Sequence, residues 1–144
     1  MKKAVSILVL FLCFMCFPLK AEGKTVEIYT AYDLVKLAKE CHYDAYSKDL
    51  RVELMSDISL RDVKDFSLMV FDGVFDGNGH TISDYIVDGR FSPCGFVGHL
   101  MDNGRIENLH IEGVSVPGGD GNNAGIFAGI NDGVIEDCSF KGTI

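Results

Sequence analysis

Apolar residues in the second half of the chain recur at short spacings that glycine interrupts. Residues 104–113 read GRIENLHIEG and residues 133–142 read GVIEDCSFKG, so their glycine, Ile-Glu and later apolar positions coincide at an offset of 29 residues. The preceding segments also match, with GFVG at 95–98 and GIFAG at 125–129. A third copy, FDGVFDGNGHTISDYIV at 71–87, aligns at an offset of 24. A period of this length indicates stacked supersecondary units.

Short β-strands joined by tight turns explain these units best, because the units are too short and too rich in glycine for helix pairs. Parallel pairing of successive units would stack equivalent residues in internal columns. The alignment predicts three columns: Ile82, Ile106 and Ile135; Tyr85, Leu109 and Cys138; Val87, Ile111 and Phe140. The expected fold class is mainly β, a parallel β-helix (β-solenoid) of about three coils with a small N-terminal α/β cap.

The head of the chain differs from this body, since residues 24–60 lack glycine and 15 of the 16 glycines lie between Gly73 and Gly142. Alternation at 25–29 predicts a strand, and Thr30 followed by Asp33 predicts a capped helix start. Apolar positions 34, 37, 38 and 41 give that helix one apolar face and place its end near His42. Residues 43–49 are predicted as a turn, and residues 51–60 as strand with a break at 56–57. We expect a strand-helix-strand cap over 24–60 and repeats over 61–144.

The N-terminus has the pattern of a secretory signal peptide over residues 1–23. Lys2 and Lys3 precede an apolar run over 4–19, and Ala21 and Gly23 are small residues at the spacing of a signal-peptidase site. The alternative is an uncleaved anchor, although the run is shorter than the roughly 20 residues of a spanning helix. We expect a secreted or cell-surface protein.

Charge and cysteine content narrow the class of partner. Without residues 1–23, 10 basic and 20 acidic residues remain, which disfavours nucleic acid and anionic lipid. Cys41, Cys94 and Cys138 are an odd, widely spaced trio without metal-ligand spacing, typical of small buried residues. One disulfide with a free thiol is the alternative.

Four carboxylates and an imidazole lie close in sequence around the third copy: Asp72, Asp76, Asp84, Asp88 and His80. β-Helix polysaccharidases carry acidic residues on an external face, where a pair supplies a general acid and base. Adjacent aspartates and a Gly-His-Gly motif, as in polygalacturonase-like enzymes, are absent, and Lys64, Arg90, Arg105 and Lys141 form no repeating column for a lyase. We therefore expect no catalytic residues; a polysaccharide-active enzyme fragment is the alternative.

Metal and cofactor motifs are also incomplete. Asp76-x-Asn78 resembles the start of an EF-hand loop, but its twelfth position is Val87. His42, His80, His99 and His110 lack the spacing of a metal-ligand set. Asp-Gly and Asn-Gly favour left-handed backbone, so residues 76–79 are predicted as a corner, with His80 bonding a carbonyl across it. No metal and no cofactor is expected.

Two segments are candidates for binding. Exposed aromatic residues favour carbohydrate, but the chain has no Trp. Its tyrosines Tyr29, Tyr32, Tyr43 and Tyr46 gather in the head, and the last two either face solvent or cover the stack. Residues 117–123, PGGDGNN, form either a projecting binding loop or a connector. An extracellular glycan or a host or surface protein is the expected class of partner.

Several segments together resemble the GLUG-type repeats of bacterial surface and adhesin-like proteins. The segments are FDGNGHTIS, GFVG, GRIENL and GIFAGINDGVIEDC, and residues 25–60 resemble the usual lead-in with its TAYDL helix and DISL strand. Such repeats are also similar to non-catalytic regions of bacterial IgA-specific metallopeptidases. The resemblance implies a secreted, right-handed parallel β-helix that serves as a stalk or binding scaffold, with no catalytic set.

Two departures from the family matter. Members usually carry many more coils and further C-terminal domains, whereas this sequence stops at 141–144 as a third unit closes. An open last coil exposes strand edges and apolar columns. We expect a truncated or split product, or a partner that covers this end. A non-catalytic N-terminal region of a secreted metallopeptidase is a further alternative.

Overall fold

The computed structural model of the protein describes residues 23–116 and 123–143. The predicted signal peptide, apart from Gly23, and residues 117–122 of the predicted loop lie outside this range. The helices are α2 (Ala31–Glu40) and α3 (Asp44–Ser47). The strands are β1 (Thr25–Ile28), β2 (Arg51–Leu54), β3 (Ile58–Ser59), β4 (Leu68–Phe71), β5 (Val74–Asp76), β6 (Thr81–Asp88), β7 (Val97–Leu100), β8 (Arg105–Glu107), β9 (His110–Val116), β10 (Ala128–Asn131), β11 (Val134–Glu136) and β12 (Ser139–Thr143).

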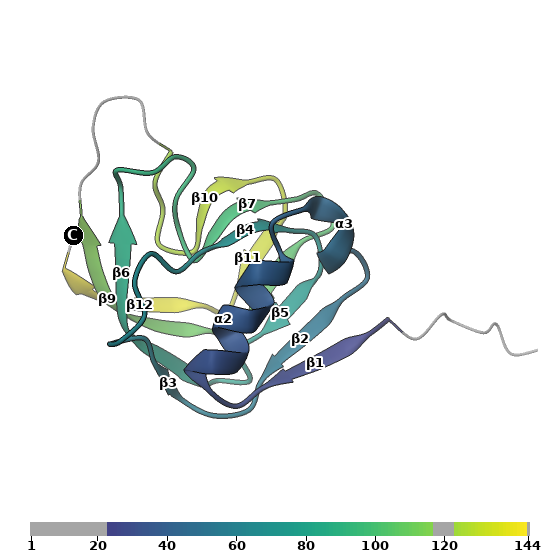
Figure 1. Cartoon of the computed structure of the whole chain (residues 1–144), viewed down its shortest axis with the longest axis horizontal. Helices are drawn as coiled ribbons and strands as arrows, with labels where there is room; N and C mark the ends of the chain where they lie inside the picture. The colour runs from purple at the N-terminus through teal and green to yellow at the C-terminus, as the bar shows by residue number, and fades with distance from the viewer. Residues whose placement is uncertain (1–22, 117–122, 144) are drawn as a thin grey trace, which may run out of the picture.

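The described chain is mainly β, and its strands form three parallel sheets (Figure 1). Their orders are β1-β2-β5-β8-β11, β10-β7-β4 and β12-β9-β6-β3. From β4 onward the chain passes from the three-stranded sheet to the five-stranded sheet and then to the four-stranded sheet, and it repeats this order through β12. Strands far apart in sequence therefore lie side by side and in parallel, as the repeat predicted.

The predicted alignment of the last two units is confirmed by the strand register. Ile135 pairs with Ile106 in the five-stranded sheet, and Phe140 pairs with Ile111 in the four-stranded sheet. Their shared glycine has a physical reason. A Cβ on Gly113 would lie 2.0 Å from the Tyr85 carbonyl oxygen, and one on Gly142 would lie 1.8 Å from that of Gly113. Only glycine allows this close approach of neighbouring strands.

The predicted alignment of the third copy is wrong. Ile82 was predicted to stack with Ile106, but it pairs with Ile111. The residue of this copy that pairs with Ile106 is Phe75. Tyr85 pairs with Gly113 and Val87 with Ser115, so neither continues the column assigned to it. The error has a local cause: Asp84 in β6 and Asn108 after β8 both have left-handed backbone, with φ of 56° and 53°. The former accompanies an irregularity within one strand, whereas the latter is a corner between two sheets.

The head follows its predicted order, and its strands belong to the same sheets as the body. The Thr30 hydroxyl accepts from the Asp33 backbone and the Asp33 carboxylate accepts from the Thr30 backbone, so α2 begins with a capping box. It ends at Glu40, two residues before the predicted position. The region predicted as a turn at 43–49 contains the single turn of α3. The predicted break at 56–57 separates β2 from β3.

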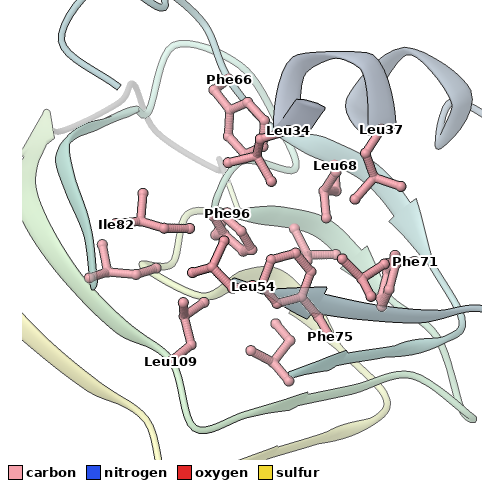
Figure 2. Close-up of a cluster of buried hydrophobic side chains, with 14 of the residues drawn as sticks. Leu34, Leu37, Leu54, Phe66, Leu68, Phe71, Phe75, Ile82, Phe96 and Leu109 are labelled. Carbon is pink, nitrogen blue, oxygen red and sulfur yellow. The ribbon is translucent and has the colours of Figure 1, made fainter. Parts of the chain in front are cut away.

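The core is one cluster that joins head and body. Figure 2 shows Leu34 and Leu37 of α2 pointing toward side chains of the sheets. Aromatic rings fill its centre, with Phe75 and Phe96 centroids 5.1 Å apart in an edge-to-face arrangement. None of the described helices is both long and apolar enough to cross a bilayer.

Candidate functional site

The residues 76–80 that suggested a reactive cluster form the corner between β5 and β6. Asn78 and Gly79 have positive φ of 49° and 76°, as the Asn-Gly pattern predicted. A Cβ on Gly77 would lie 2.4 Å from the Asn108 carbonyl oxygen, so glycine is required where the next corner stacks on this one. The corner prediction is confirmed.

Asp76 is the buried acid of this corner, and its oxygens are occupied by the fold. Its Oδ2 accepts from Arg51 at 2.6 Å, and its Oδ1 accepts from the Asn78 backbone at 2.8 Å and from Asn108 Nδ2 at 3.2 Å. The Asn78 side chain in turn donates to the Leu54 carbonyl at 3.0 Å. These bonds join successive strands of the five-stranded sheet.

His80 braces the corner, but its partner is a carboxylate and not the predicted carbonyl. His80 Nδ1 lies 3.2 Å from Asp57 Oδ1, which also accepts from the Thr81 backbone at 2.9 Å. The bond from Thr81 and then that from His80 hold the pKa of the Asp57 carboxyl below its usual value. The imidazole therefore fastens the start of β6 to the turn before β3.

The other candidate acids are separately engaged. Asp72 accepts from the Asn103 backbone at 3.1 Å, and Asp84 accepts from the Ser59 hydroxyl at 2.6 Å. Asp88 is bound by the Arg90 backbone and guanidinium, whose hydrogen bonds lower the pKa of Asp88 to about 2. In the part of the chain that the structure describes, no three His, Cys, Asp or Glu side chains gather as a metal site requires.

An acidic column runs across the outer face of the five-stranded sheet. Register places one carboxylate on each strand: Glu27, Glu53, Asp76, Glu107 and Glu136. Arg51 contacts Glu53, Asp76 and Glu107, and Arg105 contacts Glu107 and Glu136. Each arginine thus bridges successive strands, and the column acts as a ladder of ion pairs. Like charges on neighbouring strands are destabilising without such bridges.

The remaining histidines have protein partners as well. His99 Nε2 lies 2.6 Å from Asp132 Oδ2, and His110 Nδ1 lies 2.5 Å from the Ser139 hydroxyl. The first contact joins β7 to the residue directly after β10, and the second joins β9 to β12. They fit a structural role for these imidazoles.

The three cysteines in the described residues are free thiols. Cys41 and Cys94 are buried and Cys138 is partly buried. Burial raises the pKa of the Cys41 thiol to about 12 and raises that of Cys94 and Cys138 as well. The thiolate is the nucleophilic form of cysteine, so these environments suppress reactivity. Cys138 follows the left-handed Asp137, as Leu109 follows Asn108, in agreement with the predicted stacking of these two residues.

The predicted tyrosines divide into exposed and covered residues. Tyr29, Tyr32 and Tyr43 are exposed, whereas Tyr46 packs against the core with Lys24 over its ring. Tyr29 donates to Glu27 at 2.8 Å. Tyr32 lies on α2, and Tyr43 directly precedes α3. Of the predicted loop, only Asn123 is described.

A mainly apolar pocket of about 310 Å³ lies where β4, β6 and the segment before β7 meet. Its walls include Phe66, Met69, Tyr85, Ile86, Phe91, Pro93 and Cys94, and its charged lining residues are Asp65 and Asp88. The repeat pattern of the sequence did not indicate this site. The one sequence feature that pointed to it is Phe91, a bulky apolar residue between β6 and β7. The Phe91 side chain is 57% exposed.

Comparison with known proteins gives one partial similarity. Over 75 residues, 51% of its length, the chain is 40% identical to halomucin from Haloquadratum walsbyi (strain DSM 16790 / HBSQ001). The match covers 1% of halomucin, so the chain spans a small fraction of this relative. No family model matches the chain. No solved structure matches it.

Proposed function

We propose that this chain is a secreted, non-enzymatic scaffold module of a bacterial cell-surface protein of the GLUG type. In this proposal the three sheets are the faces of a right-handed parallel β-helix of about three coils, capped at the N-terminal side by α2. The observation that carries the proposal is the repeated passage of the chain through three parallel sheets in a fixed order. Such stacks form elongated, rigid surfaces suited to stalks and binding modules.

The use of the polar side chains supports a scaffold over an enzyme. Asp76, Asn78 and Asn108 bind one another and the backbone of neighbouring strands, and His80 is held by Asp57. A general acid or base must reach a substrate proton within hydrogen-bond distance. Side chains that fasten corners are poorly placed for that task. We therefore keep the assignment of no catalytic residue.

The exposed side of the last unit, residues 133–142, supports a proposal that further coils or a partner cover it. Ile106, Leu109 and Ile111 are at most 1% exposed, whereas Ile135, Cys138 and Phe140 are only partly buried. Among the described strands, β10, β11 and β12 each have a neighbour on one side only. Apolar surface and unpaired strand edges of this kind favour association. We propose that one more structural layer packs on this end in the working protein.

An extracellular location is part of the same proposal. The signal-peptide pattern of residues 1–23 supports it, and so does the partial match to halomucin. The first strand begins at Thr25, two residues after the expected cleavage position. A chain cleaved after Gly23 thus keeps all the described elements.

Fractionation of cells that make the protein tests this location. We expect the protein in the medium or on the cell surface. Its N-terminal sequence should begin at Lys24, and its intact mass should be that of a chain without residues 1–23. An Ala21→Arg, Gly23→Arg variant should retain residues 1–23, because signal peptidase needs small residues there. A cytoplasmic protein that keeps residues 1–23 would contradict the proposal.

A further inference from the structure

Exposed apolar side chains gather around the pocket between β4 and β6. We call Met69, Ile86, Phe91, Val114 and Val116 the apolar patch. Their exposed fractions are 40%, 58%, 57%, 46% and 41%. The first three line the pocket. The patch continues onto β9, which lies beside β6 (Figure 1), because Ile86 pairs with Val114 and Asp88 with Val116. Contiguous exposed apolar surface of this kind marks sites of interaction.

The floor of the pocket is aromatic and fixed in place. Phe66 and Tyr85 are 7% and 2% exposed, and their rings meet edge to face at 6.3 Å. The Tyr85 hydroxyl donates to the Phe66 carbonyl at 3.4 Å. The ring of Phe96 packs against both of these rings, with its centroid 5.5 Å from that of Phe66 and 6.1 Å from that of Tyr85. The floor therefore offers a preformed apolar surface, which lowers the entropic cost of binding.

The polar groups of the pocket are largely used within the protein. The Ser67 hydroxyl donates to the Gly95 carbonyl at 2.7 Å, and the Ser92 hydroxyl accepts from the Asn123 backbone at 3.1 Å. Asp88 is bound by Arg90. The hydroxyls of a sugar would find few partners here, and burying them unpaired is costly. An apolar side chain fits this chemistry better than a glycan.

The charge around the pocket restricts the occupant further. The charged lining residues are the carboxylates Asp65 and Asp88, and Asp65 is exposed at the rim. The whole chain carries a formal net charge of −8. Arg90 is paired with Asp88 and also interacts with Asp65, so one carboxylate charge is in excess among these three groups. A cationic group beside the apolar side chain would be attracted to Asp65, whereas an anionic ligand would be repelled.

We propose that this pocket binds a peptide segment of a partner protein, with a bulky apolar side chain in the pocket and a Lys or Arg beside Asp65. The proposal rests on the scaffold role proposed above and names a class of partner for it. Interface centres are rich in aromatic residues and Met, with charged groups at the rim, which is the composition seen here. Binding by the purified protein is independent of where the cell places it, so this proposal and the proposed location can fail separately.

Fluorescence anisotropy with three dye-labelled peptides tests the proposal on the full chain. One peptide has a central Phe-Leu flanked by lysines, the second has Ala-Ala at the centre, and the third has glutamates in place of the lysines. We expect saturable binding of the first peptide. The Ala-Ala peptide should bind at least about tenfold more weakly, since a buried Phe or Leu is worth more than 1.4 kcal/mol. The glutamate-flanked peptide should also bind more weakly, because Asp65 repels its charges. The Asp65→Asn variant should weaken binding of both lysine-flanked peptides and should not weaken binding of the glutamate-flanked peptide.

Matched surface variants locate the site. Phe91→Ser and Ile86→Ser should each weaken binding of the first peptide about tenfold or more, while Tyr32→Ser, at an exposed aromatic residue of α2, should leave it unchanged. Circular dichroism checks that each variant folds. Equal loss in Tyr32→Ser, absence of binding at millimolar peptide, or displacement of the peptide by a neutral oligosaccharide would overturn the proposal.

Discussion

At the scale of single residues, Asp76 shows how an apparent reactive group becomes a structural one. Its side chain is 9% exposed and accepts from Arg51 on β2 and from Asn108 after β8. Arg51 lies on one of the two strands that flank β5 in the sheet, and Asn108 directly follows the other. A carboxylate so placed joins three strands through charge-assisted hydrogen bonds, which are stronger than neutral ones.

Removing this carboxylate should destabilise the protein strongly. We expect Asp76→Ala to lower the free energy of unfolding by about 2–3 kcal/mol, because Arg51 and Asn108 lose a partly buried partner. Urea denaturation followed by circular dichroism measures the change. Asp102→Ala, at an exposed turn residue, is the matched control and should cost less than about 0.5 kcal/mol. Equal effects of the two substitutions would show that the corner is not held by Asp76.

At the scale of elements, α2 was predictable because its signals are local. Thr30 and Asp33 form the capping box, and Leu34 and Leu37 are buried on one face, as spacing in the sequence indicated. The short α3 was not predictable in this way. Its Ser47 is buried and accepts from the Asp72 backbone at 2.9 Å, so a contact with β4, distant in sequence, accompanies this single turn.

The capping box makes a pH-dependent contribution that can be measured. Hydrogen bonds, first from the Tyr29 backbone, lower the pKa of Asp33. A lowered folded-state pKa means that this stability is present above the unfolded value of about 3.9 and is lost as the pH falls through the folded value. Asp33→Ala should therefore destabilise the protein at neutral pH and progressively less in acid.

Thr30→Ala provides the control for that titration. Its cost of about 1 kcal/mol should depend much less on pH, because the hydroxyl is neutral throughout. Urea unfolding midpoints of the two variants and the parent, measured between about pH 7 and pH 3, give the comparison. A cost of Asp33→Ala that stays constant in acid would contradict a role for the charged carboxylate.

At the scale of the whole molecule, repetition was visible wherever neighbouring units share both spacing and corner. Residues 104–113 and 133–142 pair as aligned, since Ile135 meets Ile106 and Phe140 meets Ile111. The copy at 71–87 was misplaced because its apolar spacing around the left-handed Asp84 imitates that around Asn108. Sequence spacing alone does not tell an irregularity within a strand from a corner between sheets.

The apolar patch could not be predicted from the sequence, for a different reason. Met69 on β4 and Ile86 on β6 belong to different sheets and meet only where the folded sheets line one pocket, and Val114 joins them through the parallel pairing of β9 with β6. Phe91 comes from a segment outside the repeated pattern. Contacts between residues that the repeat does not align carry no periodic signal, so a site built from them becomes visible only in the folded structure.

The most direct test of the stacked scaffold is to add one more unit. We would append a second copy of residues 116–144 after Ile144. The added unit should bury Ile135, Cys138 and Phe140, just as the unit at 133–142 packs over Ile106, Leu109 and Ile111. A control carries the same addition with serine at the duplicated Ile135 and Phe140. The free energy of unfolding in urea is the measurement. We expect a rise of at least about 2 kcal/mol, with a larger denaturant dependence, for the apolar addition only. Unchanged stability, or an equal rise in the control, would show that the units do not stack.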